Sequence, residues 1–298
     1  MTRWTDAGGF DAYVPRIMAK LARLPRGAAL LPGLAVLILV VGIDGAGRQF
    51  GLRLVPLYVP LLCVMSWVLA RRLAILFAAV TAIVALLPDI LASPSAPGAA
   101  TAANAAVRGA VYIFLALVVA AYRRAYDEAD YRAMYDALTG ALNKLPFQAA
   151  VVRHLAAARR NRQTSVAACI DLDGFKAINA SYGPATGDAT LRAAAQDAMS
   201  GVRGSDLMGR IGGDEFGFLL GAGSAQNAEA LARLLHQRVG TTLAKSGLPL
   251  TCSMAALIVG PDVALSGVEL FDLVYGLMRR AKTEGSGVVL IEAAPAGR

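Results

Sequence analysis

Apolar residues are concentrated in the first 121 residues of the chain, where they form long runs. A helix of about 20 apolar residues is long enough to cross the hydrocarbon core of a bilayer. Four runs come close to this length, at residues 28–43, 52–70, 73–91 and 105–122. The pattern therefore predicts an all-α bundle of about four transmembrane helices within residues 27–121.

After residue 135 the pattern changes to shorter segments with strand or helical periodicity. Short apolar runs bounded by turn residues predict strands, and apolar positions three or four apart predict helices. Central strands with helices on one face would make an α+β sandwich. In chain order we predict a helix at 146–162, a strand at 166–172, helices at 174–183 and 186–201, a hairpin at 207–220, a helix at 225–245, a strand at 251–259, a helix at 265–283 and a strand at 287–291.

Residues 122–135 connect the two regions and contain the charged sequence RRAYDEADYRAMY. The segment continues the fourth apolar run without Gly or Pro, so we predict one helix that leaves the membrane as a signalling linker. A weak apolar seam includes Tyr122, Ala125 and Ala129. The linker therefore either pairs with its twin in a homodimer or remains a solvated single helix.

Basic residues flank the apolar runs unevenly. They occur at 16–26, at 71–72 and at 123–124, whereas the loop at 89–104 contains no Lys or Arg. Because basic loops stay in the cytoplasm, we expect both termini there. Residues 1–26 would then be a cytoplasmic basic segment, either an amphipathic helix on the membrane surface or a plain tail.

Composition agrees with a membrane protein. The 298 residues are 56% hydrophobic and carry a net charge of +8. Because many basic residues flank the apolar runs, we attribute the charge to membrane orientation and expect membrane lipid, not nucleic acid, as a partner. Arg108 lies inside the fourth run, where it either snorkels to the interface or binds an anionic ligand. The three cysteines lack metal-ligand spacing, which indicates reduced thiols.

The segment 207–220 reads LMGRIGGDEFGFLL and predicts a β-hairpin. Glycines at 212–213 would accept the positive φ that a tight turn demands. The adjacent carboxylates of Asp214 and Glu215 repel each other unless a cation lies between them. Taken alone, the Asp-Glu pair favours an exposed acidic turn.

A second acidic strand end occurs at 166–173. Strand alternation places Asp171 and Asp173 on one face and Leu172 on the other. If this strand pairs with the hairpin, its carboxylates converge with those at 214–215. Oxygen ligands without nearby Cys or His suit Mg²⁺ or Mn²⁺, which often share their coordination with substrate phosphates. The pattern therefore predicts nucleotidyl transfer assisted by metal.

The sequence at 212–216, GGDEF, resembles the motif that names the GGDEF domain, the catalytic domain of diguanylate cyclases. The flanking motifs resemble those of the family in order and spacing, and we predict such a domain over 136–294. They are DALTG at 136–140 with Asn143, DLDGFK at 171–176, Asn179, Tyr182-Gly183, Gly187-Asp188, and Ala281-Lys282 with Gly285.

This resemblance implies a ferredoxin-like fold, similar to the palm of adenylyl cyclases and polymerases. It also implies condensation of two GTP into cyclic di-GMP with release of pyrophosphate. Each domain would hold one GTP, so two domains of a homodimer must face each other. The membrane region would be sensory, in a multi-pass protein of the bacterial inner membrane with its catalytic domain in the cytoplasm.

The resemblance also implies residue roles. Asp214 and Glu215 would be catalytic, and Glu215 would bind a second metal or help to remove a proton. Asp173 would be structural. The implied metal ligands are Asp171, the carbonyl of Leu172, Asp214 and Glu215. The implied substrate-binding residues are Phe175, Lys176, Asn179, Asp188, Gly212, Gly213 and Lys282, of which Asn179 and Asp188 would read guanine and the two lysines would bind phosphate.

Some positions depart from the family pattern. Ser286 replaces an arginine that helps to hold terminal phosphates, and Arg279 stands where a tyrosine is expected. Arg279, together with Arg280, is a candidate to compensate. These changes concern GTP affinity more than chemistry, because every acidic ligand is present.

The sequence RGSD at 203–206 lies at the spacing that the family uses for its inhibitory product site. An arginine fork can bind guanine and phosphate, and a carboxylate can accept from the N1 edge of guanine. Arg203 and Asp206 are therefore candidates to bind cyclic di-GMP, with either Arg233 or Arg238 completing the site.

Three functions remain open from the sequence. The first is an active diguanylate cyclase, which the intact acidic residues favour. The second is a catalytically weak domain that acts as a cyclic di-GMP receptor, which Ser286 favours. The third is an enzyme of the same type that makes a different cyclic dinucleotide.

Overall fold

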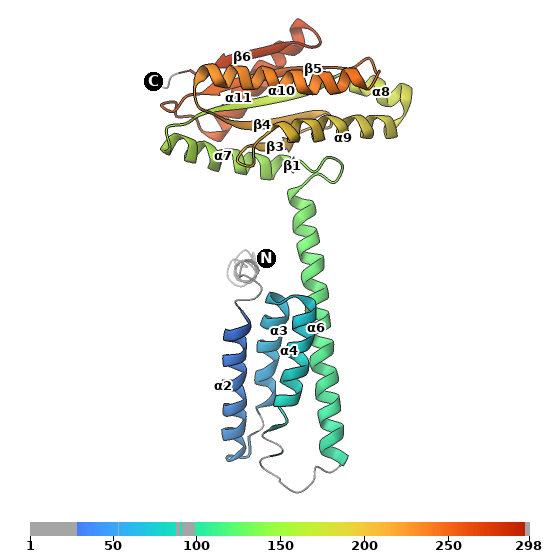
Figure 1. The fold of residues 1–298 in the computed structure, drawn as a ribbon, viewed down its shortest axis with the longest axis vertical. Coiled ribbons are helices and arrows are strands. Elements are labelled where there is room, and N and C mark those ends of the chain that lie inside the picture. Colours follow the sequence, from blue (N-terminus) through green and yellow to red (C-terminus); the bar gives the residue numbers. More distant parts are fainter. Residues whose placement is uncertain (1–28, 53, 88–89, 91–98, 296–298) are drawn as a thin grey trace, which may run out of the picture. The chain divides into compact units, whose positions relative to one another are not determined.

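The computed structural model describes residues 29–52, 54–87, 90 and 99–295 (Figure 1). Contacts within the chain divide it into two compact units, residues 1–129 and 130–298. We describe each unit by itself. The predicted basic segment at 1–26 lies outside the described residues.

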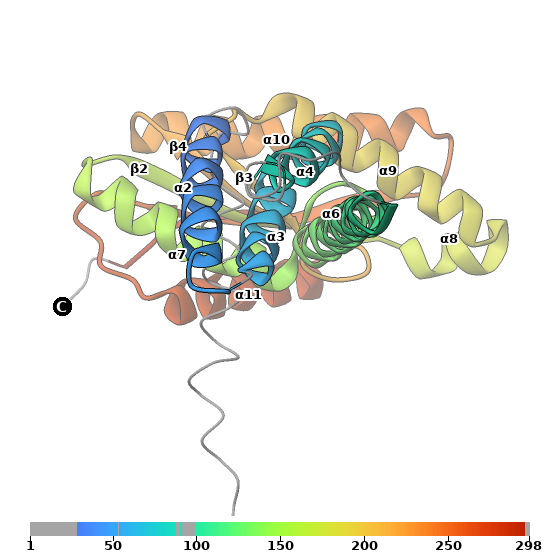
Figure 2. The same cartoon turned by 90° about the horizontal axis from the view of Figure 1, so that it is seen from below.

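The N-terminal unit is helical, and Figure 2 shows its helices nearly end-on. Helix α6 continues without a break to Met134, as the sequence predicts for the linker. The helices are α2 (Leu30–Arg48), η1 (Val55–Leu57), α3 (Tyr58–Val68), α4 (Arg71–Val84) and α6 (Ala99–Met134).

The expectation of four membrane spans is not supported. Among the described residues, two helices are long and apolar enough to cross a bilayer, at Leu30–Gly47 and Ala102–Met134. The apolar helix at Val55–Val68 and the 14-residue α4 are shorter. At 1.5 Å per residue each would extend about 21 Å, less than the roughly 30 Å of the hydrocarbon core.

A buried acid links helices of this unit. Asp44 of α2 is fully buried, and its Oδ1 accepts a hydrogen bond of 2.9 Å from the backbone N–H of Leu54. Its Oδ2 lies 3.4 Å from the hydroxyl of Tyr58. The rings of Tyr58 and Tyr112 are 6.2 Å apart, and Arg108 lies within electrostatic reach of both. The sequence analysis missed Asp44 because the partners described here, Leu54 and Tyr58, lie 10 and 14 positions away in the chain.

The C-terminal unit contains a six-stranded mixed sheet with the order β1-β3-β4-β2-β5-β6. Its four central strands are antiparallel neighbours in the order β3-β4-β2-β5, which is the ferredoxin-like order of a split βαβ fold. The strands are β1 (Leu142–Asn143), β2 (Thr164–Asp173), β3 (Leu207–Arg210), β4 (Glu215–Ala222), β5 (Thr251–Val259) and β6 (Val289–Ala293).

The helices of this unit lie close to the positions that the sequence predicts. Helix α11 begins with a capping box, in which Ser266 and Glu269 bond each other's backbone N–H. The helices are α7 (Lys144–Arg160), α8 (Phe175–Tyr182), α9 (Pro184–Gly201), α10 (Ala225–Lys245) and α11 (Gly267–Glu284).

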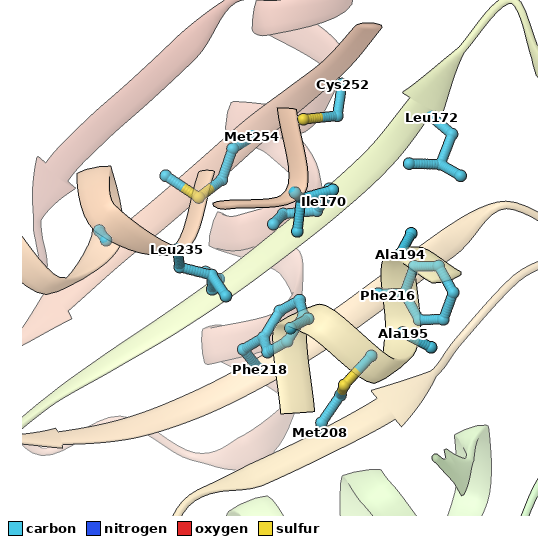
Figure 3. Close-up of a cluster of buried hydrophobic side chains, with 14 of the residues drawn as sticks. Ile170, Leu172, Ala194, Ala195, Met208, Phe216, Phe218, Leu235, Cys252 and Met254 are labelled. Atoms are coloured by element: carbon cyan, nitrogen blue, oxygen red, sulfur yellow. The ribbon is translucent and has the colours of Figure 1, made fainter. Parts of the chain in front are cut away.

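Helices cover both faces of the sheet, so the prediction of helices on one face is wrong. Ile170 and Phe218 pack with α9 and α10 on one face, as Figure 3 shows for the side chains of that core. Cys169 and Leu219 pack with α7 and α11 on the other. The reason is visible in β2, where consecutive residues are apolar and a strand buried on both sides needs no polar face.

Candidate active site

Strand pairing brings the predicted acidic residues to one end of the sheet. Asp171, near the end of β2, lies opposite Glu215, the first residue of β4. The backbone N–H of Leu172 donates to the carbonyl of Asp214 at 3.1 Å. The predicted convergence of the two acidic strand ends is therefore present in the fold.

The turn between β3 and β4 differs from the predicted one. Neither Gly212 nor Gly213 has a positive φ. Gly212 is needed for space instead, because a Cβ there would lie 2.6 Å from Oε2 of Glu215. The missing side chain thus allows the Glu215 carboxylate to lie against the turn.

Lys282 of α11 connects two of the acids. Its Nζ forms an ion pair with Asp171 and lies 2.5 Å from Oδ1 of Asp173. Asp173 also accepts hydrogen bonds from the hydroxyls of Thr251 and Ser253 and, at 2.8 Å, from the N–H of Gly287. With four donors on one carboxylate, Asp173 is held as a structural element of the site.

The acids of the site differ in the direction of their pKa shifts. Burial raises the pKa of Asp171, and repulsion from Asp214 and Asp173 adds to this, while Lys282 opposes it. Burial and repulsion from Asp171 and Asp214 likewise raise the pKa of Glu215. Burial also acts to raise the pKa of Asp173, but hydrogen bonds from Lys282 and Gly287 outweigh it and lower the pKa. The site therefore contains more negative charge than its lysine neutralises.

No preformed cation cage exists in the part of the chain that the structure describes, because no three His, Cys, Asp or Glu side chains there are placed to hold a metal. The donor set nevertheless fits a divalent cation, since it consists of carboxylates with unbalanced repulsion. Lys282 contacts Oδ1 of Asp171, which leaves Oδ2 of that carboxylate as a possible ligand atom.

The residues predicted to contact the base lie on α8 and at the start of α9. Asn179 packs closely on Gly187, where a Cβ would lie 1.9 Å from its Oδ1. This Oδ1 is buried without a hydrogen-bond partner among the described residues. Asp188 follows Gly187 directly. Phe175 is buried in the core beside Gly187, whereas Lys176 is exposed.

The predicted product-site segment lies between α9 and β3, at the end of β3 away from the turn. Arg203 is exposed, while both carboxylate oxygens of Asp206 accept backbone N–H bonds, from Arg203 at 2.8 Å and from Gly221 at 3.0 Å. Arg238 bonds Ser200 near the end of α9 at 3.1 Å, whereas Arg233 pairs with Glu229 on its own helix. Of the two arginines predicted to complete the product site, Arg238 is therefore the one that lies near this segment.

The residues near Lys282 that depart from the family pattern have different surroundings. Ser286 is exposed. Arg280 forms an ion pair of 2.6 Å with Glu292, so its guanidinium is already engaged. Arg279 is exposed and forms no ion pair with any residue that the structure describes.

Two residues near the site were missed by sequence analysis. Arg210 of β3 donates to the carbonyl of Gly213 at 2.6 Å and pairs with Asp136 at 3.0 Å. Tyr275 of α11 lines a small cavity behind the acidic strand ends. The Arg210–Asp136 pair and the position of Tyr275 both depend on segments that are distant in the sequence. The arginine in the hairpin and the DALTG motif were the only hints of the first contact in the sequence.

An α+β domain with acidic residues at the ends of paired central strands is typical of nucleotidyl-transferring proteins. Residues 133–287, just over half of the chain, match the family described as "Diguanylate cyclase, GGDEF domain". The chain belongs to this family.

Known proteins similar to the chain include two from Escherichia coli (strain K12). The chain is 41% identical over 97 residues to the probable diguanylate cyclase DgcE, covering 33% of this chain and 9% of DgcE. It is 34% identical over 140 residues to the diguanylate cyclase DosC, covering 46% of this chain and 28% of DosC. The chain thus spans less than a third of either relative.

A solved structure shows the same fold. It is the coiled coil and GGDEF domain of DgcB from Caulobacter crescentus, in complex with c-di-GMP. The TM-score is 0.52 at 22% identity, and the match covers 59% of this chain and 94% of that chain. At this identity the likeness concerns the fold alone.

Proposed function

We propose that the C-terminal unit is a diguanylate cyclase, which joins two GTP molecules into cyclic di-GMP and releases pyrophosphate. The observation that carries this proposal is the pairing of Asp171 with Glu215 beside the Asp214 turn, within a domain of the GGDEF family. Asp214 and Glu215 would act at the reacting phosphate, since both lie where the turn meets β4.

Asp171, the carbonyl of Leu172, Asp214 and Glu215 would hold Mg²⁺ or Mn²⁺. A divalent cation would supply charge neutralisation at the α-phosphate and a lower pKa of the attacking hydroxyl. The raised pKa values of Asp171 and Glu215 support this proposal, because a cation would relieve the repulsion that raises them.

Lys282 would exchange one anionic partner for another during binding. In the structure its ammonium forms ion pairs with both Asp171 and Asp173. Substrate phosphates would offer it a replacement for Asp171, while Asp173 keeps its three other donors. Lys176 is exposed and would bind phosphate from α8, and the space above Gly212 and Gly213 would admit the nucleotide. Arg279, free of ion pairs with the described residues, would compensate for Ser286.

Asn179 and Asp188 would select guanine. The unpartnered, buried oxygen of Asn179 supports this role, because a base would supply the missing hydrogen bond. A carboxylate at 188 could accept from both N1–H and the exocyclic amine of guanine. Phe175 would contribute through packing, since it supports Gly187 from the core.

Assembly and location are further parts of the proposal. Each domain would bind one GTP, so a homodimer through the linker part of α6 would bring two domains together. The apolar helices α2 and α6 would place the protein in the bacterial inner membrane, in contact with lipid. Cyclic di-GMP bound at Arg203 and Asp206 would provide feedback.

The test is incubation of the purified full chain with GTP and Mg²⁺, followed by chromatography of the nucleotides. We expect cyclic di-GMP and pyrophosphate from a dimeric preparation. Ser286 favours a second candidate, a cyclic di-GMP receptor with weak catalysis. A folded dimer that binds cyclic di-GMP and forms no product would establish the receptor instead.

A further inference from the structure

Tyr275 has a hydroxyl group that the fold leaves unused. The oxygen is buried and has no hydrogen-bond partner among the described residues. Burying a hydroxyl without a partner is unfavourable, so a buried hydroxyl of this kind calls for an explanation. Burial, with a further contribution from Glu215, raises the pKa of Tyr275, so its phenol is protonated at neutral pH and can donate.

Glu215 is a hydrogen-bond acceptor that lacks a side-chain donor. Its carboxylate is only partly exposed, and it accepts no side-chain hydrogen bond from any residue in the described part of the chain. Lys282 bonds Asp171 and Asp173 but not Glu215. Glu215 therefore lacks a side-chain donor, and Tyr275, on which the charge of Glu215 acts, lacks an acceptor.

The sheet register places these two groups on one face. Cys169 lies opposite Gly217, and two residues further along Asp171 lies opposite Glu215. Alternate strand residues point to the same side, so all four positions lie on the face of the sheet that α7 and α11 cover. Tyr275 lines the same cavity as Cys169 and Gly217.

The geometry of helix α11 also places Tyr275 near these strand positions. Tyr275 precedes Lys282 by seven residues, which is about two helical turns, so both project from one face of the helix. Because Lys282 reaches Asp171, the phenol two turns earlier lies next to the preceding strand positions. Glu215 is the acidic residue whose charge acts on Tyr275.

We propose that Tyr275 is a positioning residue, which donates a hydrogen bond to Glu215 when nucleotide and metal bind. The bond fixes one carboxylate oxygen and directs the other toward the reacting groups. The inference rests on the proposed cyclase function. The competing explanation is a structural one, because the cavity of about 20 Å³ can hold one water molecule that satisfies the phenol.

The test compares the full chain, purified in detergent, with Tyr275→Phe, which keeps the ring and removes only the hydroxyl. Mn²⁺ binding is measured by electron paramagnetic resonance in the presence of a non-hydrolysable GTP analogue. We expect about tenfold weaker Mn²⁺ binding, the scale of losing one hydrogen bond to a charged group. We also expect a lower kcat with nearly unchanged KM for GTP.

Two control variants separate the explanations. Tyr131→Phe removes an exposed phenol from α6 and should leave Mn²⁺ binding unchanged. Cys169→Ala removes a thiol that lines the same cavity as Tyr275, and it should also leave Mn²⁺ binding unchanged.

Equal Mn²⁺ affinity in Tyr275→Phe, with only a lower Tm, would identify a structural hydroxyl and overturn the proposal. A loss in Cys169→Ala equal to that in Tyr275→Phe would also overturn it, because the thiol would then be the partner. Failure of the parent chain to bind Mn²⁺ at all would reject the cyclase assignment and this inference together.

Discussion

Arg210 and Asp136 form an ion pair between the β3–β4 hairpin and the start of the GGDEF domain, with Nη1 3.0 Å from Oδ1 and 3.2 Å from Oδ2. The same guanidinium binds the carbonyl of Gly213 in the turn. Asp136 also accepts bonds from the N–H and the hydroxyl of Thr139. Arg210 thus connects Asp136, two positions after the end of α6, to the turn that holds Asp214.

Asp136→Asn should destabilise the unit 130–298 by about 1–2 kcal/mol at neutral pH, because Arg210 then lacks its carboxylate partner. Burial acts to raise the pKa of Asp136, but bonds from Thr139 and Arg210 outweigh it and lower the pKa. Because the pKa of Asp136 is lower in the folded chain than in the unfolded chain, its ionised carboxylate stabilises the fold at pH values above the unfolded pKa of about 3.9. This stabilisation is lost as the pH falls through the folded pKa.

Urea unfolding of parent and variant from pH 7 to pH 3 measures this difference. The gap between them should be constant at neutral pH and shrink below about pH 4. Asp262→Asn is a matched control, because Asp262 forms an exposed ion pair with Arg162. A gap that is the same at pH 3 as at pH 7 would contradict the role of the ionised Asp136.

Asp214→Asn should abolish turnover while the fold survives, because the turn keeps its backbone bonds and loses only a charge that a metal requires. The measurement is cyclic di-GMP formation, with circular dichroism as a check of folding. Asp272→Asn alters an exposed acid on α11 and should retain full activity. Product formation by Asp214→Asn at the parent rate would remove Asp214 from the catalytic role.

The sequence was sufficient to predict strands β2 to β6 and the convergence of the acids. The apolar run of β2 ends in Asp171 and Asp173, and that of β4 begins at Glu215, so antiparallel pairing of the two runs brings the carboxylates to one end of the sheet. The same run in β2 could have predicted helices on both faces, since Val166, Ala167 and Ala168 leave no polar side.

Other features could not be predicted from local patterns. Strand β1 has two residues, too short to show periodicity, and it exists because it pairs with β3. The contact of Tyr275 with the cavity behind Cys169 depends on how α11 crosses the sheet. The ion pair between Lys282 and Asp171 joins residues 111 positions apart. Such contacts are set by tertiary packing, which no short motif encodes.

Asp188→Asn should reduce the preference for GTP over ATP, because an amide presents one donor and one acceptor where the carboxylate accepts twice. The loss should be roughly tenfold or more in the ratio of kcat/KM values, as expected when a buried bond is left unmade. Asp197→Asn, later on the same helix, is the matched control. Unchanged discrimination in Asp188→Asn would reject its assignment to the base.

Arg203→Ala should relieve inhibition by cyclic di-GMP and leave the initial rate nearly unchanged. Arg203 is exposed and separated from the acidic turn by the length of β3, so product bound there does not compete directly for the metal site. Product would instead favour an arrangement in which the two domains cannot face each other, and activity falls as that population grows.

Asp206→Ala provides the contrast to Arg203→Ala. Its carboxylate accepts the N–H groups of Arg203 and Gly221, so its loss should lower Tm as well as product affinity. Arg238→Ala should reduce inhibition more than Arg233→Ala, since Arg238 contacts the end of α9 and Arg233 pairs with Glu229. Titration of initial rates with cyclic di-GMP measures all four variants. If Arg203→Ala is inhibited as strongly as the parent, feedback does not act through this segment.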